Sequence, residues 1–117
     1  MVTHQVRARR KSAEYLLQDV HLYAAREAVR YAGKRVGNDV DKIGYTLSDV
    51  CSCLQRLTTA QYQESIQYLD VASWHDVYLI SEVGPDGSSR DLYIKFKFFG
   101  ERLVLSLCSF HPEGWET

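Results

Sequence analysis

The sequence predicts an α+β fold in which N-terminal helices pack on a C-terminal three-stranded antiparallel sheet. Two patterns predict it: apolar residues recur at helical spacing before residue 70, and they alternate with polar residues after residue 73. Helices followed by strands in this order are typical of the α+β class. The 117 residues suffice for one domain with one core, which we expect at residues 12–117, behind a flexible basic N-terminal arm at residues 1–11.

The stretch 91–98 has the clearest strand pattern in the chain. Its apolar residues are Leu92, Ile94, Phe96 and Phe98, and they alternate with Tyr93, Lys95 and Lys97. Such a strand has one face for a core and one polar, cationic face for solvent or a ligand. The neighbouring strands begin near Trp74 and end near Leu107, and the segments 84–89 and 100–101 carry the turn residues between them.

Three helices are expected before the strands. Ser12 is a good N-cap for a long amphipathic helix from about Ala13 to Tyr31 or Lys34. After a polar connection over residues 38–45, with room for one helical turn, Ser48 (or Thr46) caps a second helix that reaches Leu57. A third, short helix is expected at residues 60–68, and Glu64 lies on it.

Composition excludes several functional classes. The formal net charge of −1 does not indicate nucleic-acid binding by itself, although a basic cluster lies between Arg7 and Lys11. The apolar runs are far shorter than a membrane helix needs, and the first residues lack the apolar core of a secretion signal, so we expect a cytoplasmic protein without a membrane partner. The 3 cysteines lack the spacing of a zinc site, which favours small hydrophobic residues in the core.

Two segments carry a resemblance to a known family. Trp74-His75-Asp76-Val77-Tyr78, followed by Leu92-Tyr93-Ile94-Lys95-Phe96, resembles the MqsR toxins of bacterial type II toxin–antitoxin systems over roughly residues 47–110. The resemblance implies a RelE-like fold and a ribosome-independent endoribonuclease, an mRNA interferase that cleaves single-stranded mRNA. It also implies a cognate antitoxin protein as partner and no metal or organic cofactor.

The resemblance places four catalytic positions on this chain. The family's catalytic tyrosine falls on Tyr93 and is present. Its glutamine between Trp and Asp is His75 here, and its lysine before a serine is Glu64. Its C-terminal lysine falls near Cys108, beyond which His111 is the nearest titratable group.

A cleavage site with these residue types remains chemically competent. Without a metal, the ribose 2′-OH attacks the adjacent phosphate, a base takes its proton, an acid protonates the leaving oxygen, and donors stabilise the phosphorane. Histidine exchanges protons near pH 7 and a buried glutamate can join it. The candidate catalytic residues are therefore His75, Tyr93, Glu64 and His111, and the candidate RNA-binding cations are Lys95, Lys97, Arg90 and Arg102. We expect the phenol of Tyr93 and the imidazole of His75 to converge on one accessible pocket.

Two other functions fit the same residues. The first is a catalytically inactive RelE-like binding module that engages an antitoxin or another protein partner, which the absent lysines and the low net charge favour. The second is a nucleic-acid-binding regulator that uses the basic arm from Arg7 to Lys11. Growth arrest on expression without a partner distinguishes the toxic enzyme from a binding module.

Overall fold

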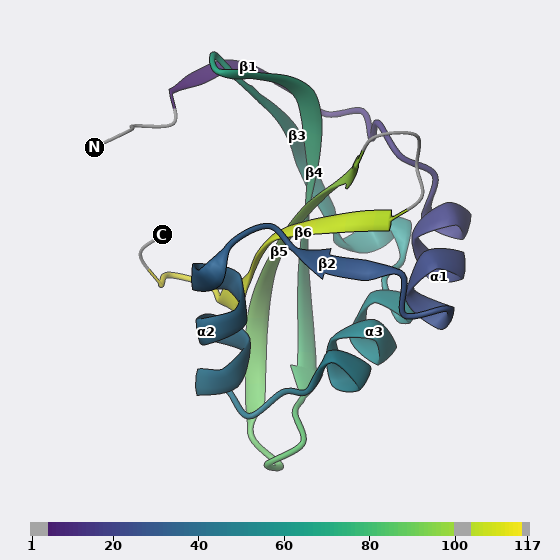
Figure 1. The fold of residues 1–117 in the computed structure, drawn as a ribbon, viewed down its shortest axis with the longest axis vertical. Coiled ribbons are helices and arrows are strands. Elements are labelled where there is room, and N and C mark those ends of the chain that lie inside the picture. Colours follow the sequence, from purple (N-terminus) through teal and green to yellow (C-terminus); the bar gives the residue numbers. More distant parts are fainter. Residues whose placement is uncertain (1–4, 100–103, 116–117) are drawn as a thin grey trace.

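The protein is a six-stranded mixed sheet with three helices, in a computed structural model that describes residues 5–99 and 104–115 (Figure 1). The strands are β1 (Val6–Arg10), β2 (Val29–Tyr31), β3 (Tyr62–Tyr68), β4 (Val71–Val83), β5 (Ser89–Phe99) and β6 (Val104–Pro112). The helices are α1 (Leu17–Ala25), α2 (Lys34–Lys42) and α3 (Leu47–Gln55), with a 3₁₀ turn, η1 (Thr59–Gln61). The strand order is β1-β3-β4-β5-β6-β2, and β2 runs parallel to β6.

The middle of the sheet is the antiparallel run β4-β5-β6 that the alternation after residue 73 predicted. Three further strands extend it, β3 and β1 on one side and β2 on the other. The predicted three-stranded sheet with helices ahead of it is therefore wrong. Short β1, β2 and β3 segments, each of 3 to 7 residues, lack enough alternation to be recognised outside their tertiary pairing.

The predicted long N-terminal helix is wrong because the chain turns at Glu27. Helix α1 ends at Ala25, and Glu27 takes a left-handed conformation with φ 53°. The amide of Ala28 donates to the carbonyl of Tyr23 at 2.8 Å, which closes the helix end in the manner of a Schellman turn. The next residues, Val29–Tyr31, then pair with Leu105–Leu107 of β6 instead of continuing the helix.

Three other expectations need correction. Residues 60–68 form η1 and strand β3 instead of a helix, since Gln61 and Thr58 close a capping box around one turn and the chain then extends against β4. Helix α2 spans Lys34–Lys42 and so includes the first part of the supposed polar connection over residues 38–45, and it buries Val36 and Val40. Residues 6–10 form edge strand β1, where the sequence showed no regular element.

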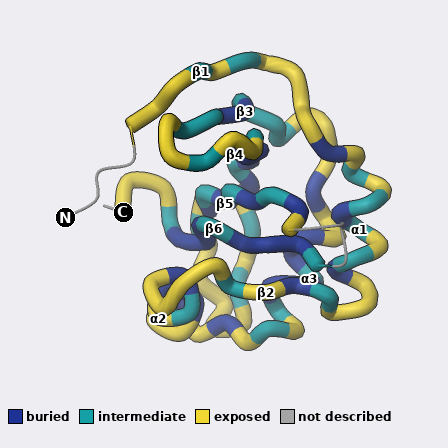
Figure 2. The backbone as a smooth tube through the Cα atoms, turned by 45° about the horizontal axis from the view of Figure 1, so that its top comes forward, coloured by how far each residue is buried: buried dark blue, intermediate teal, exposed yellow. Residues whose placement is uncertain are grey.

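All three helices bury their apolar residues in one core on one face of the sheet. The sheet contributes Leu92, Ile94, Phe96 and Phe98 of β5, as their alternation predicted. Helix α3 begins at the predicted cap, where Thr46 and Asp49 form a capping box, and it buries Cys51 and Cys53. The middle of the sheet is accordingly buried while β1 is mostly exposed (Figure 2).

A buried carboxylate ties the N-terminal segment to the sheet. Asp76 of β4 is fully buried and accepts hydrogen bonds from the amides of Glu14 and Tyr15 at 3.0 Å and from the Ser65 hydroxyl at 2.5 Å. The Tyr15 hydroxyl donates to the Trp74 carbonyl at 2.8 Å beside it. The Trp-x-Asp segment thus fixes the chain between β1 and α1.

Removal of this carboxylate should destabilise the fold strongly. Asp76→Ala leaves the buried amide of Tyr15 and the part-buried amide of Glu14 without their acceptor and removes one partner of the Ser65 hydroxyl, so we expect the free energy of unfolding to fall by about 3–5 kcal/mol. Asp91→Ala removes an exposed carboxylate whose partner is the Ser81 hydroxyl and should cost less than about 1 kcal/mol. Urea denaturation measures both values, and equal losses would contradict the role given to Asp76.

Candidate functional site

The sheet has a second face, opposite the helices, which we call the open face. On β5 its residues are Tyr93, Lys95 and Lys97, all half-buried, between the buried core residues of the same strand. Residues paired across neighbouring strands point to the same side of a sheet. The open face therefore includes these residues and their register partners on β3, β4 and β6.

The register arranges these residues in rows across the sheet. Lys95 is paired with Val77 of β4 and Ser109 of β6, and Val77 is paired with Glu64 of β3. Tyr93 forms a separate row with Leu79 and His111. Glu64, Tyr93, Lys95 and His111 thus share the open face.

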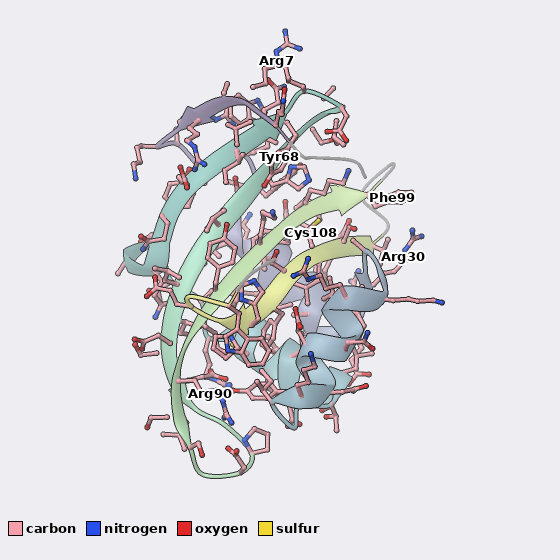
Figure 3. All side chains as sticks on the ribbon, turned by 90° about the vertical axis from the view of Figure 1, so that its left-hand side faces the viewer. Arg7, Arg30, Tyr68, Arg90, Phe99 and Cys108 are labelled. Carbon is pink, nitrogen blue, oxygen red and sulfur yellow. The ribbon has the colours of Figure 1, made fainter. Side chains whose placement is uncertain are left out.

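Lys95 lies at the centre of this face and holds Tyr68 over His75. Its Nζ donates to the Tyr68 hydroxyl at 2.7 Å, and the Tyr68 ring meets the His75 ring edge-on at 5.1 Å. Tyr68 and Cys108 both lie over the upper part of the sheet (Figure 3). His75 is consequently only 5% exposed.

The surroundings of His75 favour its neutral form. Burial lowers the pKa of His75 to about 4, and the charges of Lys95 and Lys97 act in the same direction. The Nδ1 atom lies 3.4 Å from the Ile66 carbonyl. At pH 7 the imidazole is therefore uncharged and has a lone pair that can accept a proton.

Tyr93 is the first of three stacked rings. Its ring lies 5.4 Å from that of His111 at 15°, and His111 lies 6.4 Å from Trp115 at 1°. His111 is 3% exposed, and its Nδ1 lies 2.8 Å from the Pro112 carbonyl, which can only accept. Nδ1 therefore carries the proton in the neutral ring. Nε2 keeps a lone pair, and this buried atom has no hydrogen-bond partner among the described residues.

The phenol of Tyr93 is protonated at neutral pH. Burial raises the pKa of Tyr93, while the positive charge of Lys95 partly opposes that increase. A protonated phenol is a hydrogen-bond donor and a weak acid. Tyr93 and Lys95 together provide one donor and one positive charge two residues apart on a strand.

Strand β1 adds a charged pair at the edge of the open face. Arg9 Nη1 donates to Glu64 Oε2 at 2.6 Å, with 54% of the Arg9 side chain and 24% of the Glu64 side chain exposed. The pair joins β1 to β3 beside the row that contains Lys95. Glu64, expected on a helix, is therefore a strand residue whose carboxylate is held by an arginine.

The remaining predicted site residues lie elsewhere or are unassigned. Arg90 is at the lower end of the sheet, paired with Asp86 at 2.9 Å (Figure 3). Arg102 lies outside the described residues. Cys108 is half-buried, and burial raises the pKa of its thiol. Among residues 5–99 and 104–115, no three His, Cys, Asp or Glu side chains gather to hold a metal ion.

The structure separates Tyr93 and His75 along the sheet, although it places them on one face. Tyr93 pairs with Leu79, four residues from His75 on β4, which corresponds to about 13 Å of strand. Lys95 and the ring of Tyr68 lie next to His75. The two predicted catalytic groups thus do not meet in one open pocket.

Comparison with known families identifies the class of protein. Residues 12–111 match the family described as "Motility quorum-sensing regulator, toxin of MqsA". The chain therefore belongs to the MqsR toxin family, as the Trp74–Tyr78 and Leu92–Lys95 segments predicted, and is a toxin of a toxin–antitoxin system. The family implies an antitoxin as partner.

Comparison with curated protein sequences gives no match. Within the described part of the chain, no helix is long and apolar enough to span a membrane.

Sequence reasoning missed three residues of this surface. Tyr68 was predicted to lie on a helix, so its contact with His75 on the neighbouring strand could not be predicted. Arg9 lies in a segment without apolar periodicity, and its pairing with Glu64 joins residues 55 positions apart. Trp115 follows the proline that ends β6, where no repeating pattern indicates which ring it meets.

The low pKa of His75 predicts a specific loss of stability in acid. Between pH 6.5 and 4, the unfolded chain binds a proton at position 75 that the folded chain does not, so stability falls as pH falls through this window. Allowing for solvent screening, we expect the loss to be about 2 kcal/mol. Urea denaturation of wild type and His75→Gln at pH 6.5, 5 and 4 measures it, and the variant should lack this share of the pH dependence. Parallel curves for the two proteins would rule out the buried neutral imidazole.

Proposed function

We propose that the protein is a ribosome-independent endoribonuclease that cleaves single-stranded mRNA at the open face without a metal. The observation that carries the proposal is the pair Tyr93 and Lys95, a protonated phenol and a cation two residues apart on β5. Membership of a toxin family supports a growth-inhibiting activity for this face. The RNA 2′-OH supplies the nucleophile, so the protein needs only to position the phosphate and manage charge and protons.

Tyr93 and the lysines act on the phosphate in this mechanism. The phenol donates to a phosphate oxygen and protonates the leaving 5′-oxygen, since it keeps its proton at neutral pH. Lys95 and Lys97 stabilise the negative charge that grows on the phosphorane. His111 stacks behind the Tyr93 ring and fixes its orientation.

His75 does not act on the phosphate that Tyr93 binds in this proposal. About 13 Å of strand separates the two residues, and Tyr68 covers the imidazole. A general base must lie within hydrogen-bond reach of the proton that it takes. The proposed cleavage therefore depends on Tyr93 and the lysines, and His75 is a buried, neutral residue beside Lys95.

Substitution of Tyr93 tests the proposed function. We expect wild-type protein to cleave a single-stranded RNA in the presence of EDTA, and Tyr93→Phe to lower the rate at least about 100-fold, because the variant loses the acid and donor. Tyr23→Phe, a matched change on the helix side of the sheet, should stay within about twofold of wild type. Gel analysis of end-labelled RNA measures the rates.

Two results would contradict the proposal. One is the absence of cleavage by wild-type protein on RNAs that cover all dinucleotide steps. The other is equal cleavage by wild type and a Tyr93→Phe, His75→Ala double variant. Either result would leave a family member that binds its partners without RNA cleavage by these residues.

A further inference from the structure

Strand β1 brings an arginine to the open face from outside the segment that the family comparison matches. The matched residues begin at 12, whereas β1 spans Val6–Arg10. Arg9 is in register with Ile66, which is in register with His75, so Arg9 is on the His75 side of the sheet. A charged residue that the family match does not cover therefore borders the proposed cleavage surface.

The Arg9–Glu64 ion pair contributes little to folding stability, and Arg9 keeps hydrogen-bond donors that a ligand can use. Exposed ion pairs contribute little to folding stability, and more than half of the Arg9 side chain is exposed. Guanidinium has five N–H donors in a fixed plane, and Nη1 of Arg9 donates to Glu64 at 2.6 Å, the one hydrogen bond that the Arg9 side chain makes to the described residues. More than half of the Arg9 side chain is exposed, so its other donors are accessible to a phosphate, which a guanidinium can bind in a bidentate manner.

The charges of this pair reach the proposed catalytic phenol. Arg9 lowers and Glu64 raises the pKa of Tyr93, although burial has the larger effect. Glu64 and Lys95 are two strands apart in one row, about 10 Å across the sheet. Arg9 and Lys95 therefore offer two cations along a line that crosses β3, β4 and β5.

We propose that Arg9 is a phosphate-binding residue for single-stranded RNA, and that Glu64 is a positioning residue that orients its guanidinium. The proposal rests on the proposed function, because the ligand is the phosphodiester backbone of the RNA substrate. It gives Glu64 a role other than proton transfer. It also makes β1 part of the binding surface, with the RNA backbone running across the strands from Arg9 toward Lys95.

Binding of an uncleavable RNA tests this directly. A fluorescein-labelled, 2′-O-methylated RNA 12-mer lacks the nucleophile, so anisotropy titrations between 50 and 200 mM salt report binding alone. Arg9→Ala should weaken binding about tenfold at low salt and reduce the slope of log K against log salt by about 0.7. Arg7→Ala removes the same charge from the same strand, where Arg7 makes no ion pair to the described residues, and should change affinity less than about twofold. Equal effects of the two substitutions would overturn the proposal.

Glu64 variants test the positioning role. Glu64→Ala should weaken binding in the wild-type background, because Arg9 loses its orientation, and should have no further effect in Arg9→Ala. A carboxylate that merely repels RNA predicts the opposite, tighter binding by Glu64→Ala in both backgrounds, which would overturn the positioning role. Thermal melting should show all variants folded, since an ion pair with this much solvent access contributes little to folding stability.

The same experiment separates this proposal from the cleavage proposal. If wild type binds the methylated RNA with the predicted dependence on Arg9 but does not cut unmodified RNA, the cleavage chemistry fails and the Arg9 contact stands. If wild type cuts RNA and Arg9→Ala binds and cuts like Arg7→Ala, the Arg9 contact fails and the cleavage proposal stands. Absence of binding by wild type at 50 mM salt would overturn the Arg9 proposal.

Discussion

The buried carboxylate of Asp76 constrains most of this structure. It accepts hydrogen bonds from the segment ahead of α1 and from Ser65 of β3, so one side chain on β4 joins the N-terminal segment, β3 and the sheet centre. Because Asp76 must point to the helix side, strand alternation sends His75 and Val77 to the open face. The burial of Asp76 therefore determines the face on which residue 75 lies, whatever the function of that residue.

The open face brings together hydrogen-bond donors, cations and two covered imidazoles. They lie on adjacent strands of the sheet. Lys95 illustrates the coupling: it donates to Tyr68, and its charge lowers the pKa of both His75 and Tyr93. Tyr68 covers one imidazole and the Tyr93 and Trp115 rings flank the other. The proton-accepting groups of this surface are therefore held neutral or shielded, while the phenol and the lysines remain half-exposed.

Residues on both sides of the family-matched segment frame this face. Arg9 precedes residue 12 and Trp115 follows residue 111, and both touch groups that alternation or resemblance had marked, Glu64 and His111. The chain places Glu64 and His75 where the resemblance expects a lysine and a glutamine. Arg9 of β1 adds a positive charge beside the Glu64 carboxylate. The net charge around position 64 therefore differs less from that of the expected lysine than the change to glutamate alone suggests.

The sequence by itself determined the local features that neighbouring residues control. The alternation from Leu92 to Phe98 predicted β5, and Thr46, one of the two residues predicted to cap the second helix, is the N-cap of α3. Tertiary pairing alone decided β1, β2 and β3, since strands of 3 to 7 residues are defined by their partners and Val29–Tyr31 exists only against β6. It also decided the state of the site. Tyr68 buries His75, and Arg9 donates to Glu64. Both contacts depend on the pairing of strands, so the spacing of residues along the sequence does not predict them.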